Sequence, residues 1–278
     1  MAIKEIICLL DIETDLTTAP VQIASELANK LDAHLTGVSP LIEPVVPALM
    51  VQPVPDQFIS DARNRAQEKA HSALERFSEY GERSANAFET RLMDLTPGGL
   101  DTFVNHTRMC DLLVVGQDNP DRPEPLRAEL IEAALFDSGR PILIVPYVGT
   151  EHFSAKKVMV AWDGSKTAAR AIHAAMPILE MADEVLVVMV EAQKLHLPGD
   201  PGADLAVYLS RHGVKVSVEK IPAPASGVSD ALLNYISDNQ IDLAVMGGYG
   251  HSRVREFILG GATRGMLQSM TVPCIMAH

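Results

Sequence analysis

The sequence predicts an α/β protein made of two doubly wound domains, each with a five-stranded parallel sheet flanked by helices. Two observations predict this fold. Short apolar segments alternate with helical segments along the chain, and the pattern of the first half returns in the second. The segments are apolar throughout, as is typical of parallel strands that helices cover on both faces. The length of 278 residues suits two domains of ordinary size.

The internal repeat is carried by three pairs of apolar segments. They are residues 4–11 with 156–163, residues 110–117 with 241–248, and residues 140–147 with 272–278. Asp11 matches Asp163, an offset of 152 residues, whereas Asp111 matches Asp242, an offset of 131 residues, and Pro141 matches Pro273, an offset of 132 residues. The two halves therefore align at both ends, and the first half carries about 21 extra residues in its middle.

The extra residues fall in a segment that is rich in proline. Residues 39–56 contain five prolines and cannot form a regular helix, so they predict a long ordered loop or flap. A helical segment follows from Asp56 to about Arg83. Residues 148–155 read as a linker, which divides the chain into domains at residues 1–150 and 151–278.

The second half gives the clearest succession of elements. Its predicted strands are residues 157–162, 184–190, 214–221, 242–247 and 273–277. Its predicted helices are residues 167–181, 202–212, 227–239 and 261–269. Strands that alternate with helices in this way favour parallel βαβ units, and the two domains are expected to pack about a pseudo-twofold axis.

Composition excludes several classes of partner. The formal net charge of −13 argues against a broad nucleic-acid-binding surface, which needs clustered Lys and Arg. No apolar run is long enough for a signal peptide core or a membrane span, so we expect a cytoplasmic protein without membrane contact. The three cysteines lie far apart in or beside apolar runs, which predicts buried free thiols in a reducing compartment.

The segment of residues 246–265 contains six glycines, although its middle is predicted to be helical. Gly247 and Gly250 follow a predicted strand, and Gly260 and Gly261 precede the last predicted helix. Without a Cβ, glycine lets a phosphate approach backbone N–H groups, and a helix N-terminus favours an anion. Two interpretations stay open: the glycines serve turns alone, or they form two backbone surfaces that face one ligand.

Asp163 comes directly after the first strand of the second half. In doubly wound sheets ligands bind beyond the carboxyl ends of the strands, so this carboxylate is a candidate ligand contact. The alternative is that Asp163 only helps to cap the turn before the next helix.

The motifs VAWDGS, MGGYGHSRVREFILGGAT and VPCIMAH resemble the universal stress protein family. Nucleotide-binding members of that family carry G-x2-G-x9-G-[ST], and this chain has Gly247, Gly250 and Gly260 at the glycine positions. Gly261 stands where serine or threonine is usual, which removes a hydrogen bond worth roughly 1.5–3 kcal/mol to a charged group. The resemblance covers both halves and implies a tandem member with an adenine-nucleotide α-hydrolase-like fold.

The resemblance also implies a ligand for the second half, namely ATP or another adenine nucleotide, with or without Mg²⁺. Nine residues are implied as its contacts. Asp163 and Val190 would meet adenine and ribose, Met246, Gly247 and Gly250 would meet ribose and phosphates, and Gly260, Gly261, Ala262 and Thr263 would meet the outer phosphates.

The first half keeps Asp11 but lacks the glycines. After Gly116 its loop carries three prolines and four acidic residues, which are Asp118, Asp121, Glu124 and Glu129. Carboxylates would repel a triphosphate and proline lacks an N–H donor, so we expect a partner domain that binds no nucleotide. The two halves would form an intramolecular pseudo-dimer, and a homodimer of the whole chain is also open.

The sequence shows no obvious catalytic base, metal cage or nucleophile. The favoured function is therefore a nucleotide-responsive stress or signalling module without turnover chemistry. Two alternatives stay open: a protein-binding scaffold that needs no nucleotide and whose partner is unknown, and a slow ATPase.

Overall fold

The computed structural model describes residues 2–14, 18–42, 56–84, 87–95, 99–149, 152–191, 201–249 and 261–278. Within these ranges, ten strands and eight helices follow one another along the chain. Among the described helices, none combines the length and the apolar character needed to cross a membrane.

The elements of the first half begin with a short strand and end with another. They are β1 (Glu5–Leu9), α1 (Ala19–Leu31), β2 (His34–Leu41), α2 (Asp56–Ser84), β3 (Phe88–Asp94), α3 (Leu100–Thr107), β4 (Leu112–Gly116), α4 (Arg127–Asp137) and β5 (Ile142–Val145). The predicted proline-rich loop at residues 39–56 is wrong at its start, because Ser39, Pro40 and Leu41 belong to β2. Residues 43–55, where the flap is expected, lie outside the described residues.

The second half repeats this order of elements. They are β6 (Lys157–Ala161), α5 (Lys166–Leu179), β7 (Glu184–Glu191), α6 (Pro201–Arg211), β8 (Val216–Pro222), α7 (Val228–Asp238), β9 (Leu243–Gly247), α8 (Gly261–Ser269) and β10 (Cys274–Ala277). Every strand and helix predicted for this half is confirmed, and each boundary lies within two residues of its predicted place.

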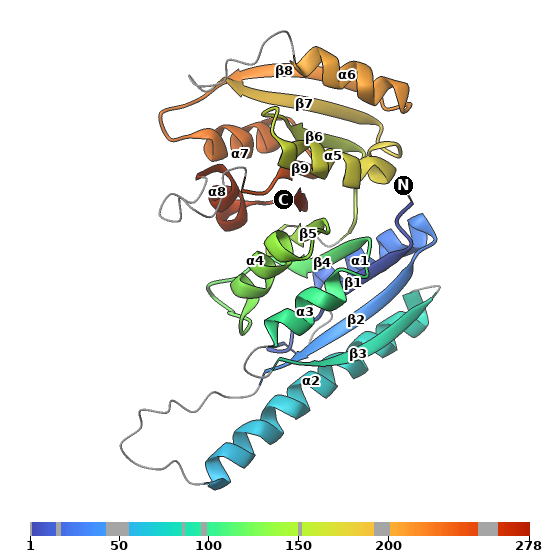
Figure 1. The fold of residues 1–278 in the computed structure, drawn as a ribbon, viewed down its shortest axis with the longest axis vertical. Coiled ribbons are helices and arrows are strands. Elements are labelled where there is room, and N and C mark those ends of the chain that lie inside the picture. The colour runs from blue at the N-terminus through green and yellow to red at the C-terminus, as the bar shows by residue number, and fades with distance from the viewer. Residues whose placement is uncertain are drawn as a thin grey trace.

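All ten strands form one sheet, in the order β3-β2-β1-β4-β5-β10-β9-β6-β7-β8. Each half contributes five parallel strands with the same internal order, as the predicted fold class requires. The halves join edge to edge through β5 and β10, which pair antiparallel, with Ile144 opposite Cys274 and Ile142 opposite Met276. Figure 1 shows the two halves stacked along the longest axis of the molecule, with this junction between them.

Helices cover both faces of the sheet. Successive side chains of a strand point to opposite faces, so Ile6 and Cys8 of β1 enter one core and Ile7 and Leu9 enter the other. One core contains residues of α1, α2, α5 and α6, and the other contains residues of α3, α4, α7 and α8. Each core runs through both halves, which makes the joined sheet the common scaffold of the molecule.

Helix α2 has 29 residues and extends away from the sheet at its N-terminal end (Figure 1). Its buried residues, Ala70, Ala73, Phe77 and Gly81, all lie in the C-terminal half of the helix. The sequence predicts this helix well, from Asp56 to about Arg83, because no proline or other break interrupts it.

Candidate functional site

A cavity of about 510 Å³ opens at the carboxyl ends of β6, β7 and β9. Strand β6 lies between β9 and β7 in the sheet, so the chain leaves β6 toward one side and reaches β9 on the other. This is the point at which the strand order reverses, where doubly wound sheets bind their ligands. The cavity therefore lies where the fold itself favours a binding site.

Seven of the nine predicted nucleotide contacts line this cavity. They are Asp163, Val190, Met246, Gly247, Gly261, Ala262 and Thr263. The seven come from four separate parts of the chain, namely the end of β6, the end of β7, the end of β9 and the start of α8. The other two, Gly250 and Gly260, lie outside the described residues.

Nine further residues of the cavity wall were not predicted from the sequence. They are Ala161, Trp162, Thr167, Val188, Ser226, Gly227, Val228, Ser229 and Leu232. Those at 226–229 lead into α7, and Gly227 has a φ of 116°, a conformation that favours glycine. Gly227 lies between a strand and a helix, and this position could have indicated a site residue, because the loops after all strands of a parallel sheet meet at one edge.

Asp163 fits both interpretations that the sequence leaves open. Its Oδ1 accepts the backbone N–H of Ser165 at 2.9 Å, so the side chain stabilises the turn before α5. Ser165 then caps the helix, with Oγ accepting the N–H of Ala168 at 3.1 Å. Asp163 is also exposed and lines the cavity, so the turn fixes a carboxylate at its wall.

Gly247 lies where the sheet and α5 come closest at the cavity. A Cβ built on Gly247 would lie 2.6 Å from the backbone nitrogen of Ala168 and 2.6 Å from Oγ1 of Thr167. Atoms so placed cannot coexist, so only glycine fits between β9 and the first turn of α5. Thr167 is buried by the same contact.

Thr263 connects α8 to the segment after β9. Its buried Oγ1 accepts the backbone N–H of Tyr249 at 3.1 Å. Tyr249 has a φ of 48°, which is unusual for a bulky residue and requires support from its surroundings. Burial raises the pKa of the Tyr249 phenol, and nearby Glu132 adds to the rise while Arg264 opposes it. The phenol therefore stays protonated at neutral pH.

Gly261 begins α8, and among the described residues nothing lies within 4 Å of a Cβ built on it. The first turn of α8 contains no acidic residue that would compete with an anion for the N-terminus of the helix. This side of the cavity combines open space with the positive end of a helix dipole.

In the first half, the corresponding position after β1 is occupied by the protein's own side chains. The Arg127 guanidinium, only 3% exposed, forms an ion pair with Asp11 through Nη2 and Oδ1. Glu124 accepts the backbone N–H groups of Ile12 and Glu13, both at 2.9 Å. Burial raises the pKa of Glu124 above its usual value. A smaller cavity of about 270 Å³ remains beside this cluster.

Neither metal nor thiol chemistry finds support in the described part of the chain. There, no group of three or more His, Cys, Asp and Glu side chains is arranged to hold a metal ion. Cys8, Cys110 and Cys274 are buried free thiols, as the sequence predicts. Burial raises the pKa of Cys110 and of Cys274 to about 12, which keeps both protonated and unreactive.

The fold and the cavity define a tandem α/β protein, with two doubly wound halves that share one sheet and a ligand-sized cavity at the switch point of the second half. The chain matches a universal stress protein of Synechocystis sp. with 29% identity over 139 residues. That match covers 49% of this chain and 46% of the relative, so it spans about half of each protein. No protein-family model matches the chain.

Two solved structures match the chain over nearly its whole length. A universal stress protein from Archaeoglobus fulgidus superposes with a TM-score of 0.59 and 19% identity, covering 98% of this chain and 97% of the other. A protein from Pseudomonas aeruginosa described as a putative universal stress protein gives 0.58 and 13% identity, covering 99% and 93%. These structures share the fold of the chain, and the sequence match over half of its length is with a protein of the family that its motifs resemble.

Proposed function

We propose that the second half, residues 151–278, binds ATP or another adenine nucleotide in the cavity at the carboxyl ends of β6, β7 and β9. Residues 1–150 would form a partner domain that binds no nucleotide. The proposal rests on one observation above all: seven predicted contacts from four parts of the chain line a single cavity. Its volume of about 510 Å³ lies within the range of small-molecule sites.

The cavity offers different chemistry on its two sides. Val190, Met246 and Leu232 give an apolar surface of the kind on which a planar base packs, and Asp163 supplies a carboxylate acceptor beside it. On the other side Gly247 and Gly261 bring bare backbone near the N-terminus of α8, which suits phosphate oxygens. We propose Asp163 and Val190 as contacts of adenine and ribose, and Gly250 and Gly260 as further phosphate contacts.

Mg²⁺ would enter with the nucleotide, held by its phosphates. The role of a cytoplasmic stress or signalling module belongs to the same proposal, since it rests on the family and on three buried free thiols.

Isothermal titration calorimetry of the full chain with ATP, AMP and adenosine tests the proposal. We expect one nucleotide per chain, with competition among the three ligands for the same site. Replacing Asp163 by Asn should weaken binding of all three by about tenfold, the effect of one charged hydrogen bond. Two nucleotides per chain would contradict the assignment to one half. No binding of any of the three would favour the nucleotide-independent scaffold.

A further inference from the structure

Gly248 and Tyr249, which follow β9, contact both the last residues of the chain and helix α4 of the first half. Gly248 donates its backbone N–H to the carbonyl of Ala277 at 2.9 Å, and His278 Nδ1 lies 3.0 Å from its carbonyl oxygen. A Cβ on Gly248 would lie 2.8 Å from Cδ2 of Leu135, a side chain of α4 that is only 1% exposed. Gly248 is therefore in close contact with a helix of the other half.

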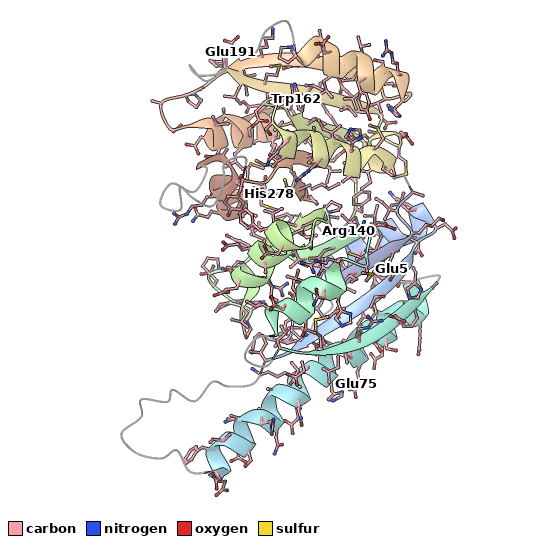
Figure 2. All side chains as sticks on the ribbon, in the orientation of Figure 1. Glu5, Glu75, Arg140, Trp162, Glu191 and His278 are labelled. Atoms are coloured by element: carbon pink, nitrogen blue, oxygen red, sulfur yellow. The ribbon has the colours of Figure 1, made fainter. Side chains whose placement is uncertain are left out.

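Tyr249 makes the next contact across this junction. Its ring packs against Phe136 of α4 with 4.8 Å between the ring centres, and Phe136 also lies 4.8 Å from the ring of His278. Figure 2 shows His278 at the junction between the two halves, and Figure 1 shows α4 on the first-half side of it. A tyrosine with a positive φ persists only where packing over-determines it, and Phe136 supplies much of that packing.

The same residue reaches the wall of the proposed site. The N–H of Tyr249 is bonded to Oγ1 of Thr263, and Thr263 lines the cavity in the first turn of α8. A chain of direct contacts thus runs from α4 through Phe136 and Tyr249 to Thr263. It joins the first half to the side of the cavity that suits phosphates.

The repeat places a related contact in the opposite direction. Gln117 follows β4 as Gly248 follows β9, and its Nε2 donates to the carbonyl of Leu267 in α8 at 2.8 Å. Each half thus supports the segment after the fourth strand of the other half with its last helix. The Phe136 contact is therefore part of how the halves are built together, not an isolated surface contact.

We infer that Phe136 is a positioning residue for the proposed nucleotide site, acting through Tyr249 and Thr263 on the phosphates of the ligand. The inference rests on the proposed function. It assigns the first half a part in nucleotide binding although that half takes no nucleotide itself. Phe136 is expected to affect the binding of the phosphates and not of the base, because the contacts through Tyr249 reach Thr263 in α8 and not Val190 or Asp163.

The test compares the affinities of the full-length wild type, Phe136→Ala and Phe136→Tyr for ATP and for adenosine. We expect Phe136→Ala to weaken ATP binding by about fivefold, within the range of couplings carried by packed side chains. The affinity for adenosine should stay unchanged in Phe136→Ala. Phe136→Tyr should bind ATP as wild type does, because tyrosine keeps the ring contact with Tyr249. The difference between ATP and adenosine is a readout that a general loss of stability would not produce.

Phe88→Ala is the matched control. Phe88 is another half-buried phenylalanine of the first half, and it packs on Phe77 with 6.0 Å between ring centres. It belongs to β3, at the far edge of the sheet from the second half, so its loss should leave ATP affinity unchanged.

The outcomes separate the inference from the proposed function. Wild type that binds ATP, with equal affinity in Phe136→Ala, would overturn the positioning role alone. Equal losses for ATP and adenosine, or an equal loss in Phe88→Ala, would also overturn it. Wild type that takes up neither ligand would overturn the proposed function, and the inference with it.

Discussion

The two halves place the same residue, an aspartate after their first strand, in opposite surroundings. Asp11 has a side chain that is 15% exposed and forms an ion pair with the buried Arg127. Asp163 is exposed, lines the cavity, and accepts the N–H of Ser165 within its own turn. The shared scaffold therefore keeps the aspartate in place, while the residues around it decide whether a ligand could reach it.

The difference arises from the loop and helix that follow the fourth strand. In the first half this segment brings Glu124 to the N–H groups of Ile12 and Glu13, and Arg127 to Asp11. In the first half, a carboxylate and a guanidinium thus occupy part of this position, and the remaining cavity has about 270 Å³. The cavity of the second half is larger, at about 510 Å³. An internal ion pair and a ligand site are two alternative uses of one position in a repeated fold.

The largest expected effect comes from breaking the internal ion pair. Arg127→Met would leave the carboxylate of Asp11 without its buried partner, so we expect a loss of about 3–5 kcal/mol in the free energy of unfolding. Urea denaturation measures this loss. Asp163→Asn is the counterpart in the second half, and it should change the free energy of unfolding far less because Asp163 is exposed. Equal losses in the two variants would show that the aspartates have equivalent surroundings.

A smaller effect is expected from adding one methyl group to corresponding glycines at the ends of β9 and β4. Gly247→Ala would push a Cβ to 2.6 Å from the backbone of Ala168, whereas Gly116→Ala would meet Cγ of Pro20 at 3.3 Å. Overpacking of this kind costs about 1–3 kcal/mol in the free energy of unfolding. Relief of the contact would displace the cavity wall at Gly247, so we expect Gly247→Ala to weaken ATP binding by about tenfold. Calorimetry on both variants checks this, and Gly116→Ala should bind ATP as wild type does. A loss of ATP affinity in Gly116→Ala would place a nucleotide in the first half.

The sequence predicts most of the fold because local signals carry it. Strands β6, β7, β9 and β10 are largely apolar, and glycine or serine stands before α5, α7 and α8, so the type of these elements and their boundaries follow from the pattern. The joining of the two halves into one ten-stranded sheet could not be predicted from the sequence. Strands β5 and β10 show the pattern of buried strands, and this pattern does not tell which element pairs with their edges. An edge-to-edge pairing between halves depends on tertiary contacts that no local pattern reveals.

The site was predictable to a similar degree. The glycine pattern, Asp163 and the contacts that the family resemblance implies include seven residues that line one cavity, whereas Trp162 and Val188 carry no local signal that separates them from ordinary core residues. The ion pair between Arg127 and Asp11 was missed, because 116 residues separate the partners and only the acidic residues of the loop were weighed. Pairing across such a distance follows from the packed fold and not from spacing.

The smallest expected effect concerns the second half, at Gly261, where the chain departs from the nucleotide-binding motif that it resembles. Gly261→Ser adds a hydroxyl at the start of α8, where a new Cβ would meet no atom of the described residues within 4 Å. The hydroxyl would donate to a phosphate already facing the helix N-terminus, so we expect ATP affinity to rise by about fivefold, or roughly 1 kcal/mol. Gly261→Ala is the control, since it replaces glycine without supplying a donor, and it should bind ATP as wild type does. AMP should gain less than ATP, because the outer phosphates are the groups proposed to lie at this helix. Titration of the three proteins with both nucleotides tests this prediction. An equal gain in Gly261→Ala would mean that the affinity rises through helix stability and not through the hydroxyl. No gain in either variant would place the phosphates away from α8.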